Sequence, residues 1–559
     1  MSIKDFFPIL NHLTSHTGKD WRQDLIAGIT VAVMLVPQGM AYAMLAGMPP
    51  IYGLYGGLLP LFLYAILGTS RQLSIGPVAI SSLLVMAGVS QIAEPLTPEY
   101  ISLVLLAGLL IGIVQFSLGL LRLGFLVNFI SHPVIVGFTS AAAIIIAISQ
   151  LKDFLGFKIP RYTHIYETLN YALQHLEQTN WVAVAICVVS IIFMMVMKRI
   201  SRAIPGPLIV VVFGTALVYF VGIERMAVDI VKQVPEGLPS FQLPDWSWGN
   251  IRILLPTIFT VTIIGIVESI SIAKILQSKH DYKIRSNQEL LALGFSKIGG
   301  AFFQALPSSG SFTRSAVNNE AGARSGFASI FTAILIGLTL LFLTPLFYCL
   351  PKAILAAIIL LSVKSLFEWE EAKHLWHSDR NDFYMMLITF VVTLGLGIEQ
   401  GVLAGVVLSI SMVLFKSSRP HVAVLGRLPN ETNFRNVNRF EEAQELDGIL
   451  ILRFDDQLYF ANASYFQDIV EKMVNDHPNK IEVLLLDASS IHNIDSTGIH
   501  ILEAVQQFLQ REQIQFLIVG LVGPVRDKMD KVRSMEALRK EASFLSINHA
   551  IRHCQKTTD

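Results

Sequence analysis

The chain has 559 residues, of which 53% are hydrophobic and 15% are charged, so it is more apolar and less charged than an average soluble protein. Its 42 Lys and Arg residues balance its 42 Asp and Glu residues, and this neutrality disfavours nucleic acid as a partner. The three cysteines, Cys187, Cys349 and Cys554, match neither a disulfide framework nor a metal-ligand spacing. No nucleotide-binding loop or catalytic triad is evident. We therefore expect a membrane protein without metal or cofactor, and not an enzyme.

Residues 1–21 form a polar N-terminal segment. They lack the apolar core and the small-residue cleavage site of a secretory signal peptide. We expect this segment to remain in the cytoplasm.

Apolar stretches long enough to cross a bilayer core, about 20 residues each, recur between Leu25 and Phe415. The predicted spans are 22–46, 52–69, 98–121, 131–151, 180–197, 205–222, 252–276, 325–350, 380–398 and 400–417. Shorter apolar pieces are predicted at 77–92, 287–304, 312–320 and 351–366. Together they give about fourteen membrane elements, some too short to span alone, in a transmembrane domain over residues 22–417.

Basic residues cluster in the breaks between these elements. An even number of elements separates the clusters, so all of them fall on one side of the membrane, which the positive-inside rule makes cytoplasmic. Both chain termini are then cytoplasmic. The clusters are Lys19 and Arg22; Lys198, Arg199 and Arg202; Lys274, Lys279, Lys283 and Arg285; and Lys373 and Arg380.

The C-terminal part is more charged and has a different pattern. Apolar runs of strand length, Ile449–Phe454, Val483–Leu486 and Phe516–Leu521, alternate with amphipathic helical patterns at 461–474 and 497–511. We expect a small α/β domain over residues 430–555. Ser417, Ser418 and Pro420 indicate a linker, which we place at 418–429.

The membrane body contains two Gly/Ser/Pro breaks at corresponding places. The break at 74–79 lies about forty residues after the polar stretch 37–42 of the opening span, and the break at 308–314 lies a similar distance after Glu268. Interrupted, short segments at matching positions in two halves indicate the central site of a transporter. The alternative, that both are ordinary loops, is disfavoured by the matched positions.

Two short helices beginning near Val78 and Thr313 would point free backbone N–H groups at a common centre. Each helix N-terminus acts as roughly +0.5 of a charge, so two of them with the Arg314 guanidinium give about +2, which suits a dianion. The candidate binding residues from these breaks are Val78, Ala79, Ser311, Phe312, Thr313 and Arg314.

Glu268 lies inside an apolar span, where a carboxylate costs roughly 2.5–3.5 kcal/mol on insertion scales. Burial favours its protonated form, whereas a nearby cation favours its charged form. Such a group can exchange a proton when the anion arrives, so Glu268 is the candidate proton-coupling residue. The alternative is a structural ion pair between Glu268 and Arg314.

Gln38 and Tyr42 are four residues apart and therefore share one helical face. Their amide and phenol can hydrogen-bond a bound anion or its waters. Tyr42 fits a packing role equally well.

Three motifs resemble the signature stretches of the sulfate permease family, also called the solute carrier 26 family. They are Pro37–Ala43 (PQGMAYA), Ser286–Leu290 (SNQEL) and Gly310–Asn318 (GSFTRSAVN). The resemblance implies two inverted seven-helix repeats, here about 22–222 and 252–417, that build a core domain and a gate domain, and it implies a homodimer. It also implies that Glu268 and Arg314 match a glutamate and an arginine of proton-coupled sulfate carriers. Thr313 stands where many relatives have serine.

The resemblance extends to the C-terminal domain, which is similar to bacterial anti-sigma factor antagonists. Its mark is the stretch Asn493–Gly498. Asp495 or Ser496 can cap the following helix, and a phosphate on Ser496 or Thr497 would be favoured by the helix dipole. Capping is the favoured role, and phosphorylation is the regulatory alternative.

The sequence therefore predicts a proton-coupled sulfate symporter in a bacterial-type inner (plasma) membrane. Its expected partners are sulfate, a proton and membrane lipid. The alternatives within the class are a dicarboxylate carrier or a bicarbonate or chloride carrier or exchanger. The alternatives outside it are an uncoupled anion channel, a voltage-responsive membrane protein and a membrane-tethered regulator.

Overall fold

The computed structural model describes residues 7–13, 16–125, 131–160, 162, 165–200, 205–222, 228–232, 236–280, 282–429, 432–532, 535, 538, 540 and 542–558. Arg202 of the predicted basic clusters, residues 1–6 and residue 430 lie outside the described residues. The chain divides into two compact units, Met1–Ser409 and Ile410–Asp559.

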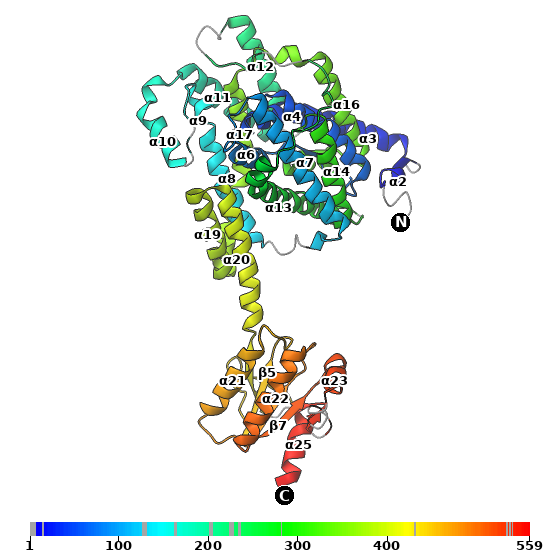
Figure 1. The fold of residues 1–559 in the computed structure, drawn as a ribbon, viewed down its shortest axis with the longest axis vertical. Helices are drawn as coiled ribbons and strands as arrows, with labels where there is room; N and C mark the ends of the chain where they lie inside the picture. Colours follow the sequence, from blue (N-terminus) through cyan, green and yellow to red (C-terminus); the bar gives the residue numbers. More distant parts are fainter. Residues whose placement is uncertain are drawn as a thin grey trace. The chain divides into compact units, whose positions relative to one another are not determined.

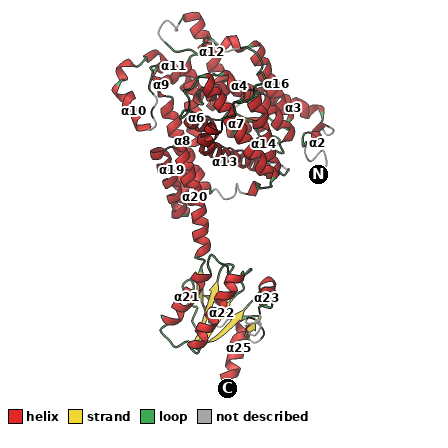
Figure 2. Cartoon of the chain, viewed as in Figure 1, coloured by secondary structure: helices red, strands yellow, loops and turns green. Residues whose placement is uncertain are grey.

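The first unit is almost entirely helical (Figure 1, Figure 2). Its helices are α2 (Leu10–Leu13), α3 (Gly18–Leu45), α4 (Ile51–Gly56), α5 (Leu59–Leu67), α6 (Ala79–Val89), α7 (Pro98–Leu120), α8 (His132–Ser149), α9 (Leu151–Leu155), α10 (Ile165–Gln174), α11 (Trp181–Ile200), α12 (Gly206–Val221), α13 (Trp248–Ser278), α14 (Ser286–Phe302), α15 (Phe312–Glu320), α16 (Phe327–Phe342), α17 (Lys352–Val363), α18 (Trp369–Ser378), α19 (Arg380–Leu396) and α20 (Ile398–Ser418), with short 3-10 turns η2 (Leu176–Gln178), η4 (Thr344–Phe347) and η5 (Lys364–Leu366). α20 continues into the second unit.

Within the described residues, six helices are long and apolar enough to cross a membrane: α3, α7, α8 with α9, α11, α13 and α20. Shorter apolar helices lie at Ile51–Leu67, Ala79–Val89, Gly206–Val221, Phe327–Phe342 and Lys352–Val363. This pattern confirms a mainly helical membrane protein. The total of fourteen elements stays a prediction.

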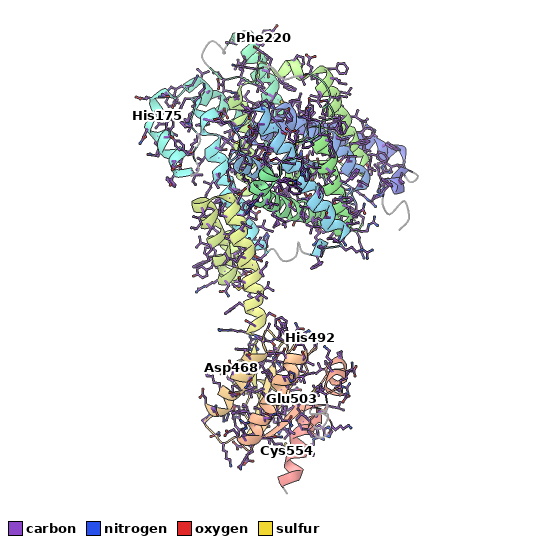
Figure 3. The ribbon with its side chains drawn as sticks, viewed as in Figure 1. His175, Phe220, Asp468, His492, Glu503 and Cys554 are labelled. Carbon is purple, nitrogen blue, oxygen red and sulfur yellow. The ribbon has the colours of Figure 1, made fainter. Side chains whose placement is uncertain are left out.

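The outer helices carry large apolar side chains on their surface. Phe213 and Phe220 of α12 are 69% and 82% exposed, and Figure 3 shows Phe220 at the edge of the first unit. An apolar surface of this kind is stable in contact with lipid chains rather than with water.

Helices α7 and α14 pack against each other through glycines. A Cβ atom at Gly294 would lie 2.4 Å from the backbone nitrogen of Phe116, and one at Gly112 would lie 2.8 Å from that of Ile298. Small residues let helix backbones approach closely where lipid supplies no hydrophobic drive for association. α14 is thereby held against α7, and this contact positions two buried polar groups described below.

The two predicted breaks form a pair of short antiparallel strands, β1 (Ile75–Gly76) and β2 (Ser309–Gly310). Ile75 pairs with Gly310, and Gly76 pairs with Ser309. Segments more than two hundred residues apart in sequence therefore meet inside the first unit, and a short helix, α6 or α15, starts just beyond each strand.

The second unit contains a six-stranded sheet in the order β4-β3-β5-β6-β7-β8. β3 (Val422–Arg427) is antiparallel to β4 (Phe434–Asn436) and to β5 (Ile449–Phe454), whereas β5, β6 (Val483–Asp487), β7 (Gln515–Val519) and β8 (Ser543–Phe544) are parallel. The helices are α21 (Ala463–Asn475), α22 (Ser496–Arg511), α23 (Gly523–Met529) and α25 (Ile547–Thr558).

Alternate residues of β5 pack on opposite faces of this sheet, as the two-residue strand period requires. Leu450 and Leu452 join the core that includes Phe466 of α21. Ile451 joins the smaller core that includes Ala550 of α25. The α/β pattern predicted for the C-terminal part is confirmed.

The predicted linker at 418–429 is wrong in one respect, because Val422–Arg427 is strand β3. The nearby serines and proline indicate a loop, yet Ala423 and Leu425 are buried on one face of the sheet. The strand is recognisable only through its pairing with β4 and β5, which lie later in the sequence.

Candidate anion-binding site

The strand pair β1–β2 holds the starts of α6 and α15 together. The Ser311 backbone N–H donates to the Ser74 carbonyl at 3.1 Å, and the hydroxyls of Ser81 and Ser309 are 3.4 Å apart. α6 begins with Val78 as its N-cap and without a side-chain cap. α15 begins at Phe312, where the predicted piece 312–320 also begins, and Ser311 caps it by accepting from the Arg314 N–H.

Arg314 is fully buried at this junction. Its Nη1 donates to the Gln38 Oε1 of α3 at 3.4 Å, and a Cβ atom on Gly76 would lie 3.0 Å from its Nη2. Nε and Nη2 are buried without a hydrogen-bond partner among the described residues. A desolvated guanidinium with free donors is suited to an oxyanion, which it can bind through two parallel hydrogen bonds.

Glu268 lies on α13, next to the same junction. The following residue, Ser269, accepts the Gly310 N–H of β2 through its hydroxyl at 2.8 Å. The Oε2 of Glu268 is buried and has no hydrogen-bond partner within the described part of the chain. Glu268 is close enough to Arg314 to interact electrostatically.

The structural ion pair, which is the alternative interpretation of these two residues, is not the arrangement found. Within the described residues no ion pair joins Glu268 to Arg314, since one Glu268 oxygen and two Arg314 nitrogens are buried without a hydrogen bond. Opposite charges held near each other without direct contact leave both groups available to a ligand or a proton.

Gln38 and Tyr42 lie in the same place, one turn apart on α3. Both are buried, at 4% and 6% exposure. The side chain of Tyr42 is hydrogen-bonded to that of Ser362 in α17. It also interacts electrostatically with Arg314 and Glu268. The polar face expected from their spacing therefore contacts the junction.

The first turn of α15 divides the predicted binding residues into two groups. Ser311 is buried, like Val78 and Ala79 of α6, whereas Phe312 is 59% exposed and Thr313 is also exposed. Successive helical residues point about 100° apart, so the turn that directs Arg314 inward directs Phe312 and Thr313 outward. The sequence predicts the four residues 311–314 as one set, whereas the structure buries residues 311 and 314 and exposes residues 312 and 313.

A second polar cluster was not expected, and it centres on Glu289 of α14. This buried carboxylate accepts hydrogen bonds from the Tyr64 hydroxyl at 2.6 Å, from the Thr69 N–H at 2.6 Å, from the Thr69 hydroxyl at 2.5 Å and from the Ser70 N–H at 3.0 Å. Its acceptor capacity is satisfied, so its role is to fasten α14 to the turn that leads into β1. The SNQEL motif is structural in this respect.

Buried Lys297, also on α14, is the other polar residue that the sequence reasoning missed. Its Nζ donates to the Gln115 Oε1 of α7 at 2.8 Å. The sequence alone could have pointed to Lys297, because it is a lysine within the apolar run 287–304. Ionisable residues in membrane segments are rare and tend to be functional.

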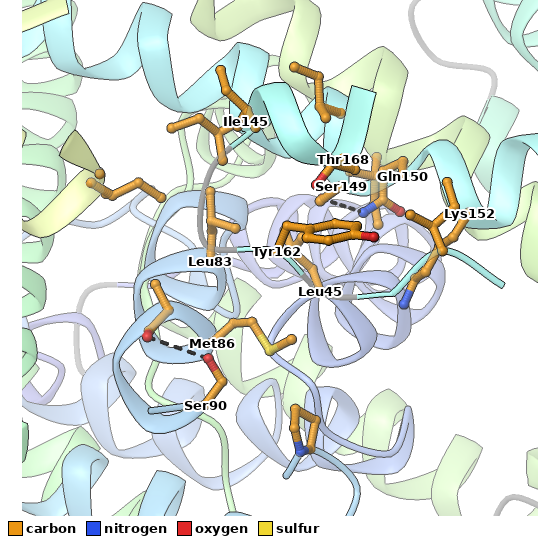
Figure 4. Close-up of a pocket in the computed structure, with 18 of the residues that line it drawn as sticks. Leu45, Leu83, Met86, Ser90, Ile145, Ser149, Gln150, Lys152, Tyr162 and Thr168 are labelled. Atoms are coloured by element: carbon orange, nitrogen blue, oxygen red, sulfur yellow. Dashed lines mark hydrogen bonds between the residues drawn. The ribbon is translucent and has the colours of Figure 1, made fainter. Parts of the chain in front are cut away.

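The structure also has a large cavity, and none of these residues lines it. It measures about 1240 Å³ and is lined by the C-terminal ends of α3 and α6, by α8 to α10, and by the N-terminal ends of α17 and α20. Figure 4 shows Leu83 and Met86 of α6, and Ser90 just after it, facing the cavity together with Ile145 and Tyr162. α6 starts at the β1–β2 junction, and Leu83, Met86 and Ala87 further along it line this cavity. The cavity therefore lies on the C-terminal side of the candidate site.

In the second unit, Asp495 caps α22. Its Oδ1 accepts the Gly498 N–H at 2.8 Å and its Oδ2 accepts the Phe460 N–H at 3.0 Å. This confirms Asp495 as the capping residue of the predicted pair. Ser496 and Thr497 are exposed in the first turn, where their phosphorylation stays a prediction.

Comparisons with known proteins agree with this architecture. Residues 21–389 match the sulfate permease family, and residues 441–540 match the STAS domain. "Sulfate transporter 4.1, chloroplastic" of Arabidopsis thaliana is 40% identical to this chain in an alignment that covers 99% of the chain and 83% of that relative. "Sulfate transporter 1.1" of the same plant is 34% identical, with 99% of the chain and 89% of the relative covered.

Two solved structures show the same fold. Murine Solute Carrier 26 family member A9 in the inward-facing state matches with a TM-score of 0.91 at 28% identity, covering 99% of this chain and 94% of that one. The transmembrane domain of the cyanobacterium bicarbonate transporter BicA matches with a TM-score of 0.62 at 23% identity, covering 71% of this chain and 98% of that one.

The chain therefore belongs to the sulfate permease family and ends in a STAS domain. It is an integral membrane anion transporter and not an enzyme. The STAS domain stands where the sequence predicts an anti-sigma factor antagonist-like domain.

Proposed function

We propose that this anion transporter is a proton-coupled sulfate symporter that works by alternating access. The observation that carries the proposal is the buried Arg314, whose Nε and Nη2 lack a protein partner within the described residues and which lies where two helix starts meet. A buried cation with unused donors requires an anionic ligand, because an unpaired desolvated charge is costly.

The charge of the site favours a dianion. Arg314 supplies one positive charge, and the starts of α6 and α15 supply roughly +0.5 each. Glu268 cancels about one of these two charges when it is ionised. A proton on Glu268 restores the sum of about +2, so sulfate and a proton are expected to bind together.

The relatives support sulfate over other oxyanions. Two Arabidopsis relatives that align with almost the whole chain are named sulfate transporters. A dicarboxylate carrier and a bicarbonate or chloride carrier or exchanger are the alternatives. An uncoupled anion channel needs no titrating carboxylate at the site, so Glu268 argues against it.

The deciding experiment is uptake of radiolabelled sulfate into proteoliposomes, with and without an inwardly directed proton gradient. We expect accumulation only with the gradient, and weak competition by chloride, bicarbonate and succinate. Equal uptake with and without the gradient would indicate a channel or an exchanger. Stronger competition by succinate or bicarbonate would indicate a different substrate.

The proposed arrangement in the membrane has both termini in the cytoplasm of a bacterial-type inner (plasma) membrane, a transporter domain over 22–417 in contact with lipid, and a homodimeric assembly. The basic clusters support this orientation. The cavity at the end of α6 then opens toward the outside.

Cysteine labelling tests the orientation. In a background without Cys349 and Cys554, Leu173→Cys on exposed α10 should react with an impermeant thiol reagent added outside intact cells. Lys279→Cys, just after α13, should react only after permeabilisation. The reverse labelling pattern would invert the topology.

A further inference from the structure

A second cation is buried in the membrane body, and the charge count above does not use it. Lys297 of α14 is 2% exposed. Its Nζ donates to the Gln115 Oε1 at 2.8 Å, and the described residues place no carboxylate in an ion pair with it. The two hydrogens left on an ammonium group are not satisfied by Gln115, so its charge acts on whatever anionic group lies near.

Gln115 connects this lysine to the helix that carries Glu268. Gln115 is fully buried, and its Nε2 donates to the Thr262 carbonyl of α13 at 3.3 Å. A Cβ atom on Gly265 would lie 3.5 Å from the same Nε2. Gly265 and Glu268 are three residues apart and are therefore neighbours on the surface of α13.

Gln115 can approach α13 this closely because Gly265 has no side chain. A Cβ atom there would also lie 2.8 Å from the Ser309 hydroxyl of β2, so α7 and β2 both approach α13 at this turn. Lys297 is consequently close enough to Glu268 for an electrostatic interaction between them. Glu268 therefore interacts electrostatically with two buried basic side chains, Arg314 and Lys297.

We propose that Lys297 is a positioning residue for proton coupling: held by Gln115, it sets the pH at which Glu268 takes up its proton. This inference rests on the proposed function. When sulfate neutralises Arg314, Lys297 is the cation that remains to stabilise ionised Glu268 and so to release the proton. Without Lys297, the carboxylate would retain its proton to a higher pH.

The other groups around Glu268 do not take this role. Tyr42 of α3 interacts with Glu268 electrostatically, but as a neutral phenol it supplies no cation. α7 and β2 present the neutral groups Gln115 and Ser309 to this turn of α13. Arg314 is occupied by the anion in the loaded transporter.

The test is the pH dependence of sulfate uptake by Lys297→Met, which keeps an unbranched side chain of nearly the same length and removes its charge. We expect the midpoint of the acid activation to move to higher pH by about one unit, which corresponds to a tenfold change in proton affinity. Lys274→Met is the matched control, because Lys274 is an exposed lysine on the same helix as Glu268 and belongs to a basic cluster that we predict to be cytoplasmic. Its profile should match that of the parent.

A double variant separates charge from packing. In a Glu268→Gln background, Lys297→Met should leave the remaining sulfate counterflow without any further pH shift, because the titrating group is gone. If Lys297→Met alone does not fold, the variant Gln115→Met/Lys297→Met removes both partners and avoids an unpaired amide. It should show the same shift.

The outcomes distinguish this inference from the function on which it rests. A parent protein that shows no proton-driven sulfate accumulation contradicts the proposed function. A parent that does accumulate sulfate, with folded Lys297 variants whose pH profile is unchanged or moves to lower pH, overturns the role of Lys297 alone.

Discussion

Arg314 illustrates how one residue combines charge and geometry at the site. It supplies a full positive charge, and without it the partial charges at the N-termini of α6 and α15 sum to only about +1. Arg314→Ala should therefore lower sulfate affinity at least tenfold, measured by equilibrium binding to the purified protein. Arg314→Lys retains the charge but loses the planar donors, so it should be impaired as well.

Arg324→Ala is a matched control for this prediction. Arg324 is exposed and donates from Nε to the Gln23 Oε1 at 2.9 Å, away from the junction. Its removal should leave sulfate binding unchanged. Wild-type affinity in a folded Arg314→Ala protein would exclude Arg314 from the site.

At the same scale, Glu268 is the residue that we propose couples transport to protons. Glu268→Gln mimics the protonated carboxyl permanently, so the variant should still exchange labelled for unlabelled sulfate in counterflow at symmetric pH. It should lose accumulation driven by an acidic exterior. Both assays are run on one liposome preparation, and gradient-driven accumulation at the parent level would assign coupling to a different group.

At the scale of elements, the contact between α7 and α14 positions the polar groups around the site. Gly294 lies against the backbone of Phe116, and Glu289 and Lys297 lie on the same helix. Gly294→Ala forces the two helices apart, and overpacking of this kind costs about 1–3 kcal/mol. We expect a lower thermal unfolding midpoint and reduced sulfate uptake.

Gly395→Ala serves as the comparison for Gly294→Ala. A Cβ atom at Gly395 of α19 would meet nothing within 4 Å, and alanine favours a helix over glycine by up to about 1 kcal/mol. This variant should unfold at the parent temperature or slightly above it. Equal melting temperatures for both variants would show that α7 and α14 tolerate separation.

At the scale of the whole molecule, the second unit should fold by itself, but its boundary matters. A fragment that begins at residue 420 contains β3, which lies between β4 and β5 in the sheet. A fragment of residues 430–555 lacks this inner strand and the burial of Ala423 and Leu425. It should be less stable by at least about 2 kcal/mol, measured by urea unfolding of the two fragments.

Two results would contradict this prediction. Equal unfolding midpoints would show that β3 adds nothing to the sheet. A longer fragment that does not unfold cooperatively would show that the second unit depends on the membrane body.

The sequence by itself determined the class of the protein and most of its elements. Hydrophobic runs identify membrane helices because the bilayer requires their length and composition, and the observed α13 (Trp248–Ser278) extends the predicted 252–276 by only a few residues. Gly/Ser breaks are also local signals. They therefore identified the short helices α6 and α15 and, with them, Arg314.

Only the tertiary structure decided which of these residues meet. The pairing of Gly76 with Ser309 joins distant segments, and no local pattern encodes such a contact. Helix packing decides that the Arg314 side chain points inward and that of Phe312 outward. It also brings Lys297 close to Glu268 through Gln115. Strand β3 was missed for the same reason, because its neighbours in the sheet come later in the chain and their pairing defines it.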